Sequence, residues 1–208
     1  RVLLPEYLCN VVPMAFERAG WCVHGYAVDD RFEPDSPALA ARAAEVGADL
    51  LLLAPLYGAD GGLSWWLGDD GRVARERLCL TLVLDICQDA GALARLPADL
   101  GHDWAALVSF NDKSFPGAMG ALCWTDIDLP PPPPPGLAAA LQMAARVLRR
   151  LLLPRRTGEE SGFEFSYASR FPYAFGTLGA TRLQLALGLV GLKRLPRLQA
   201  LRRAAVQA

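Results

Sequence analysis

The sequence predicts an α/β fold in which helices sandwich a mixed, mostly parallel sheet. Two observations favour this class. Short apolar runs, which are typical of strands buried on both faces, alternate with stretches of helical character. The repeated order of strand, helix and strand is typical of parallel sheets covered by crossover helices. With 208 residues, 52% of them hydrophobic, the chain can bury one substantial core.

The expected strands are short and apolar. In chain order they cover residues 2–4, 21–28, 49–54, 78–84, 104–110 and 119–124. Pro5 closes the first strand, and the acidic pair Asp29-Asp30 forms a turn after the second. The third, fourth and fifth runs are apolar almost throughout, as expected of strands that are buried on both faces of a sheet.

The expected helices are recognised by their ends. They cover residues 9–19, 36–46, 137–153 and 181–208. Gly20 ends the first helix, and Ser36 is predicted to be the N-cap of the second. Pro154 ends the third helix. Pro196 is expected to begin a second helical piece within the last one.

A proline run at residues 130–135 divides the chain. We expect a core α/β domain in residues 1–128, a polyproline linker in residues 129–136, and a helical C-terminal segment in residues 137–208 that packs on the core. A spacer is favoured over an SH3-type ligand for the proline run. Because the residues after Arg1 already have the character of a core strand, we also expect the natural protein to have further sequence before it.

Composition limits the classes of partner. The net charge is −1, whereas nucleic-acid-binding proteins usually have a basic excess. The two histidines lie far apart and the five cysteines form no C-x-x-C pair, so we expect no metal site. The longest apolar runs are shorter than the roughly 20 residues that a bilayer-spanning helix needs. We therefore expect a cytoplasmic protein with reduced thiols and with neither a nucleic acid nor a membrane as its partner.

Polar side chains at the ends of the predicted strands are the first candidates for a site, because ligands bind at the carboxyl edge of parallel sheets. Asp85 follows one buried run, and Ser109 lies at the end of another. A carboxylate there can cap a following helix, or it can pair with the protonated nitrogen of a pyridine ring. If a helix follows Asp85, Gln88 lies one turn away on the same side.

Lys113 is the candidate for covalent chemistry. It follows a buried strand and precedes the small residues of the segment 117–121. A Schiff base needs an amine that loses its proton near neutral pH, and partial burial lowers the pKa of a lysine in that direction. The alternative is an exposed loop lysine, which composition alone favours.

Several segments together resemble the DegT/DnrJ/StrS family of fold-type-I sugar aminotransferases, which depend on pyridoxal 5′-phosphate (PLP). Residues 84–88 (LDICQ) resemble the family's E-D-A-A-Q/H motif, and residues 109–113 (SFNDK) resemble its S-F-x-x-x-K motif. The matches run in the correct order across almost the whole chain. The other matching segments are residues 2–7 (VLLPEY), 19–20 (AG), 28–29 (VD), 56–58 (LYG), 120–121 (GA) and 184–203.

The resemblance implies a fold and a reaction. The chain would form the central part of the large PLP-transferase domain. It would transfer an amino group from an amino acid, typically glutamate, to a keto-sugar nucleotide in sugar and polysaccharide biosynthesis. Lys113 would form the Schiff base with PLP and then move the proton. Members of the family are homodimers with active sites at the interface.

The resemblance also implies roles for four further residues. Asp85 would pair with the pyridine nitrogen, and Gln88 would contact the ring or its oxygen. Ser109 would donate a hydrogen bond to the phosphate. Cys9 occupies the position at which the family often places an aromatic side chain against the other face of the ring.

The sequence departs from the family pattern at phosphate- and substrate-binding positions. The family's Gly-Thr-Ala turn at a helix N-terminus, which cradles the phosphate, has no counterpart in residues 1–208. Thr177 and Gly179 replace an asparagine and an arginine, and Pro55 replaces a histidine. The chain would therefore be a truncated or divergent member.

Two alternatives remain open. The chain can be a catalytically inactive module that keeps the PLP-transferase fold for binding or dimerisation. It can also be an unrelated doubly wound enzyme, such as a nucleotide-sugar transferase, with accidental motif matches. Trp65 and Trp66, in the loop expected at residues 58–70, can form a lid or sugar platform or can pack in the core.

Overall fold

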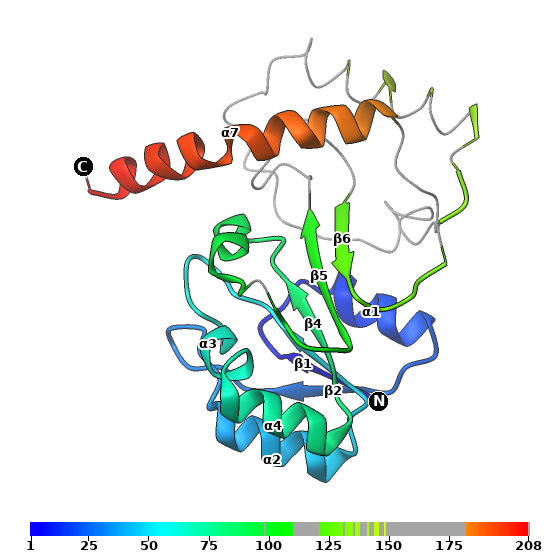
Figure 1. The fold of residues 1–208 in the computed structure, drawn as a ribbon, viewed down its shortest axis with the longest axis vertical. Coiled ribbons are helices and arrows are strands. Elements are labelled where there is room, and N and C mark those ends of the chain that lie inside the picture. The colour runs from blue at the N-terminus through cyan, green and yellow to red at the C-terminus, as the bar shows by residue number, and fades with distance from the viewer. Residues whose placement is uncertain are drawn as a thin grey trace.

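The sheet runs through the centre of the described chain. The structure is a computed structural model that describes residues 1–97, 99–109, 121–130, 132–134, 136–137, 141, 144–145, 148 and 182–207. In these residues six strands form one sheet with the order β2-β1-β3-β4-β5-β6 (Figure 1). The strands are β1 (Val2–Pro5), β2 (Val23–Tyr26), β3 (Leu50–Leu53), β4 (Thr81–Asp85), β5 (Trp104–Ser109) and β6 (Ala121–Thr125).

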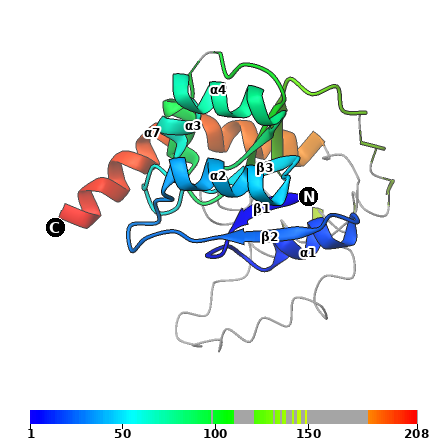
Figure 2. The same ribbon diagram turned by 90° about the horizontal axis from the view of Figure 1, so that it is seen from below.

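The sheet confirms the predicted α/β class. Strands β1 to β5 pair in parallel, and β6 pairs with β5 in the antiparallel direction, so the sheet is mixed and mostly parallel. The helices are α1 (Val11–Arg18), α2 (Ser36–Val46), α3 (Leu63–Trp66), α4 (Asp69–Leu78), the 3₁₀ helix η1 (Ala90–Arg95) and α7 (Arg182–Gln207). Figure 2 shows α2 and α4 on one face of the sheet and α1 on the other.

Alternating side chains divide the core into two layers. In β3, Leu51 and Leu53 pack with α2 and α4, whereas Leu50 and Leu52 pack with α1. Successive side chains of a strand point to opposite faces, so a continuous apolar run is what a strand needs when helices cover both faces. This is the physical reason that the third strand is apolar at every position.

Two helix boundaries differ from the prediction. The N-cap of α2 is Asp35 and not Ser36, because the Asp35 carboxylate accepts a hydrogen bond from the Ala38 backbone N–H at 3.1 Å. The predicted strand 78–84 began too early. Leu78 is the last residue of α4, and Cys79 then reverses the chain in the left-handed conformation before β4 begins at Thr81.

The last helix is continuous. Pro196 lies inside α7 and does not begin a separate helical piece, which corrects the prediction. Leu187, Leu192 and Leu195 pack against the core layer that contains α2 and α4. In Figure 1, α7 lies beyond the carboxyl ends of β4 and β5, and it contacts η1. No described helix is long and apolar enough to cross a membrane.

Candidate functional site

Three of the five predicted site residues, Cys9, Asp85 and Ser109, lie at or beside the carboxyl edge of the parallel strands. The loops after β1, β2, β3 and β4 all begin at this edge, and β5 ends there at Ser109. Such an edge is where parallel α/β sheets bind their ligands. Charged and aromatic side chains of these loops contact one another, as described below.

Asp85 is the last residue of β4, and its side chain is only 9% exposed. Its Oδ1 atom accepts a hydrogen bond from the Cys87 backbone N–H at 3.1 Å. This bond closes a bend at residues 87–88, so no helix follows the strand directly. Gln88 therefore lies in a bend and not one helical turn beyond Asp85, which corrects the prediction.

Asp85 and Ser109 lie on the same face of the sheet. Val83 packs in the core layer of α1, and Asp85 follows it by two residues. Leu107 packs against the same layer, is paired in register with Asp85, and precedes Ser109 by two residues. Because side chains two residues apart in a strand share a face, Asp85 and Ser109 share both the face and the edge.

Cys9 lies next to α1, the helix that covers this face. It lies between β1 and α1, partly buried, and its backbone carbonyl accepts a hydrogen bond from Val12 at 2.9 Å at the start of α1. Three of the five predicted site residues are thus placed on the α1 side of the carboxyl edge or at its margin. Lys113 lies outside the described residues.

Glu33 joins the loops that follow β2 and β3. Its two carboxylate oxygens accept hydrogen bonds from the backbone N–H groups of Asp60, at 2.6 Å, and of Gly62, at 3.1 Å. The Asp60 side chain in turn accepts bonds from Ser64 at the start of α3. One carboxylate therefore fixes the position of one loop relative to the other.

Arg95 extends this connection to the loop after β4. Its Nη2 atom donates to the Asp89 carboxylate at 2.8 Å and to the Ala59 carbonyl at 3.2 Å. Its Nη1 atom lies 4.0 Å from Asp60 Oδ1. The loops after β2, β3 and β4 are thus held together through Glu33 and Arg95, which the sequence reasoning did not single out.

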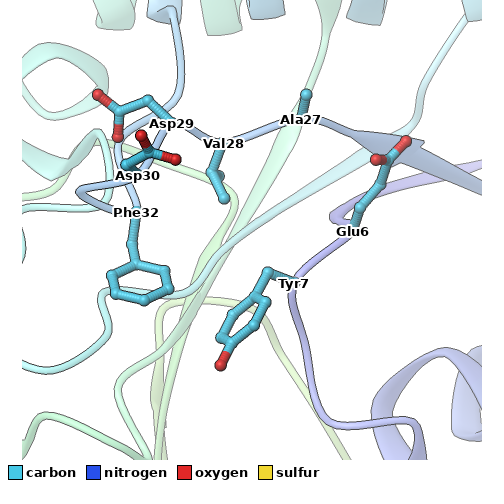
Figure 3. Close-up of a pocket in the computed structure, with 7 residues that line it drawn as sticks. All are labelled: Glu6, Tyr7, Ala27, Val28, Asp29, Asp30 and Phe32. Carbon is cyan, nitrogen blue, oxygen red and sulfur yellow. The ribbon is translucent and has the colours of Figure 1, made fainter.

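Three aromatic rings meet beside these loops. The ring centroids of Tyr7 and Phe32 are 5.1 Å apart, and those of Phe32 and Tyr57 are 5.3 Å apart. The charge and hydrogen bonding of the neighbouring Tyr7 phenol raise the pKa of Tyr57. An open pocket of about 490 Å³ lies against this cluster (Figure 3). Its lining residues are Glu6, Tyr7, Ala27, Val28, Asp29, Asp30 and Phe32.

The two tryptophans after β3 are core residues. Trp66 is fully buried in the layer of α2 and α4, and Trp65 packs against the same layer with its ring centroid 4.8 Å from that of Trp66. The sequence left open whether this pair forms a lid or sugar platform or packs in the core, and in the structure it packs in the core. The residues that form a surface feature here are Tyr57 and Phe32 instead.

The described residues fit part of a PLP site. A carboxylate that is shielded from water at the end of a central strand can pair with a pyridinium nitrogen, because a buried charge is costly without a partner. Asp85 meets this requirement, and Ser109 brings a hydroxyl to the same face for a phosphate oxygen. No group of three potential metal ligands occurs in the described part of the chain.

Comparisons with known proteins find similarity of structure only. No family model matches the chain, and no curated protein matches it. Two solved structures are similar over part of the fold. One is the histidinol-phosphate aminotransferase from Clostridium acetobutylicum, with 10% identity, a TM-score of 0.43, and coverage of 70% of this chain and 41% of that one.

The other is a protein described as a histidinol-phosphate aminotransferase from Erwinia carotovora atroseptica SCRI1043. It has 13% identity and a TM-score of 0.42, and the match covers 72% of this chain and 42% of that one. The chain thus spans about two fifths of the length of these two proteins.

Proposed function

We propose that this chain is an aminotransferase-like protein that binds PLP at the carboxyl edge of its sheet. The observation that carries the proposal is the common face and edge of Asp85 and Ser109. The motif resemblance names these same two residues for the two ends of the cofactor. Nothing in the motif match requires them to share a face, so their placement supports the resemblance independently.

Each residue has a distinct role in this proposal. Asp85 pairs with the ring nitrogen and keeps it protonated, and Ser109 donates to the phosphate. Lys113 would hold the cofactor aldehyde through its Nζ amine and, once released, would accept the proton that leaves the α-carbon of the amino acid. PLP, when bound, supplies the electron sink for this chemistry. Cys9 and Gln88 contact the faces or edge of the ring.

The substrates are a further part of the proposal and rest on the resemblance. The amino donor is an amino acid, for which glutamate is the first candidate, and the acceptor is a keto-sugar nucleotide. We also propose a homodimer, whose mass light scattering measures directly. Adding glutamate to the PLP-loaded chain and following the visible spectrum tests the donor half-reaction.

The cofactor test can assign a label to one lysine directly, because the chain has only two lysines, Lys113 and Lys193. The purified chain is mixed with PLP, its visible spectrum is recorded, and borohydride then fixes any Schiff base for peptide mapping. We expect a yellow complex and label on Lys113. Lys113→Ala removes both, whereas the matched variant Lys193→Ala keeps both.

Asp85→Asn separates cofactor binding from general folding. It keeps the side-chain volume and can still accept a hydrogen bond from Cys87, but it removes the charge that pairs with the ring. We expect weaker PLP binding and an altered absorbance in Asp85→Asn, with an unchanged unfolding midpoint. If label falls on Lys193 or on the N-terminal amine instead, the chain does not use Lys113, and an inactive PLP-transferase-fold module becomes the better description.

A further inference from the structure

Two of the three aromatic side chains in the cluster of Tyr7, Phe32 and Tyr57 are exposed, and Phe32 is half-buried. Tyr7 is 54% exposed and Tyr57 is 70% exposed. Side chains that stay this exposed lose little contact with water, so hydrophobic burial does not explain the positions of Tyr7 and Tyr57. Tyr7 follows β1, Phe32 follows β2 and Tyr57 follows β3, so three separate loops bring the rings together.

The backbone at two of these residues is held in a rarely adopted conformation. Phe32 has a φ of 64° and Tyr57 a φ of 55°. For residues with bulky side chains this left-handed region costs about 1–2 kcal/mol each. The Glu33 carboxylate holds the two loops together through Asp60 and Gly62, and the Asp29 side chain accepts bonds from the backbone of its own loop.

The pocket beside the rings is acidic. Three of its seven lining residues are carboxylates (Glu6, Asp29 and Asp30), and none of the seven is basic. Figure 3 shows Asp29 and Asp30 at one end of the pocket and Glu6 at the other, with Tyr7 and Phe32 below. Arg31 is exposed and is not part of the lining.

A glycine makes room for one of these carboxylates. A Cβ atom at Gly25, in β2, would lie 2.8 Å from Glu6 Cγ. The stem of Glu6 therefore packs directly over the backbone of the neighbouring strand, and any larger residue at position 25 would displace it. The position of Glu6 at the pocket thus depends on this close approach.

We propose that this pocket binds a small organic cation, with an ammonium or quaternary ammonium group against the faces of Tyr7 and Phe32. Aromatic faces attract cations through their quadrupole, and nearby carboxylates add a favourable field. The same carboxylates repel phosphates, so the pocket is unsuited to a nucleotide. The proposal does not depend on PLP binding, because the residues that line the pocket lie in the loops after β1 and β2 and none of them is among those proposed to hold PLP.

Choline serves as the probe, and 3,3-dimethyl-1-butanol, its uncharged isostere, serves as the control ligand. Isothermal titration calorimetry on the whole chain measures both, without PLP present. We expect choline to bind and the isostere to bind at least about fivefold more weakly. Because the carboxylates are exposed, raising the salt concentration from about 0.05 to 0.5 M should weaken choline binding.

Variants locate the site. Phe32→Leu removes a ring but keeps apolar volume, and we expect it to weaken choline binding about fivefold or more. Glu6→Gln and Asp30→Asn remove charge at opposite ends and should each weaken it. Asp128→Asn, which removes an exposed carboxylate outside the pocket, is the matched control and should leave the affinity unchanged.

Three results would overturn the proposal. The first is no binding of choline at millimolar concentration. The second is equal affinity for choline and its isostere, which would make the pocket merely apolar. The third is equal binding by wild type and the three pocket variants, with unfolding midpoints showing that each variant is folded, which would place the cation elsewhere on the chain.

Discussion

Glu33→Gln tests whether one carboxylate holds the carboxyl edge together. Glu33 is partly buried, and its two oxygens accept bonds of 2.6 and 3.1 Å from the backbone of the loop after β3. Glutamine keeps one acceptor oxygen but turns an N–H₂ group toward the second backbone N–H. At least one bond is therefore lost, and two donors then face each other.

The size of the effect follows from the kind of bond. Hydrogen bonds to charged groups contribute about 1.5–3 kcal/mol each, and a donor left without a partner costs a similar amount. We expect Glu33→Gln to lower the free energy of unfolding by about 1.5–3 kcal/mol. Partial exposure places the value toward the lower end, because water can replace part of the lost bond.

Urea unfolding followed by tryptophan fluorescence measures the change. The matched control is Glu45→Gln, which removes an exposed ion pair of 2.7 Å with Arg42. Surface pairs of this kind contribute about 0–1 kcal/mol, so this variant should remain close to wild type. If Glu33→Gln is within about 0.5 kcal/mol of Glu45→Gln, the carboxylate does not hold the two loops together, and the reasoning is refuted.

Two further predictions concern buried polar groups. Arg75 is 6% exposed, and its Nη2 donates to the Leu100 carbonyl at 2.9 Å, but its Nε and Nη1 have no hydrogen-bond partner among the described residues. Burial lowers the pKa of Arg75. We expect Arg75→Met to change stability by less than about 1 kcal/mol or to raise it, and a loss above about 3 kcal/mol in thermal unfolding would contradict this. The Tyr26 phenol donates to the Leu52 carbonyl at 2.9 Å, and burial raises its pKa well above its ordinary value of 10.0. The Tyr26 phenol ionises at lower pH in the unfolded chain than in the folded one. Its contribution to the free energy of unfolding is therefore full below pH 10, and above pH 10 it decreases by up to about 1.4 kcal/mol per pH unit. Urea midpoints between pH 9 and 11 should therefore fall more steeply for wild type than for Tyr26→Phe, and parallel curves would count against the assignment.

Much of the sheet could be predicted, because the apolar pattern that identifies a buried strand lies within the residues of that strand. A strand covered on both faces needs an apolar side chain at every position, and Leu50–Leu53 shows this directly in the sequence. Helix α4 was missed for the opposite reason. Its sequence, DDGRVARERL, is mostly polar, and it is held by a close approach to α3 in which a Cβ at Gly71 would lie 2.4 Å from Trp66 Cα.

The sequence predicted only part of the candidate site. Asp85 and Ser109 could be chosen because each follows an apolar run, and position after a strand is visible in the chain itself. That they share a face depends on the register of β4 with β5, which pairs Asp85 with Leu107. The sequence also did not predict the bend that contains Gln88, because the bend depends on one hydrogen bond from the Cys87 N–H to the Asp85 carboxylate.

The sequence by itself determined the class of the fold and the candidate residues at the ends of its strands, because hydrophobic periodicity records which faces are buried. Only the tertiary structure decided that β6 runs antiparallel and that Glu33 ties two loops together. It also brought Tyr7, Phe32 and Tyr57 into one cluster. These three residues are separated by about 25 positions each in the chain. No local pattern connects them, because their contact is a consequence of the parallel pairing that brings the carboxyl ends of β1, β2 and β3 to one edge.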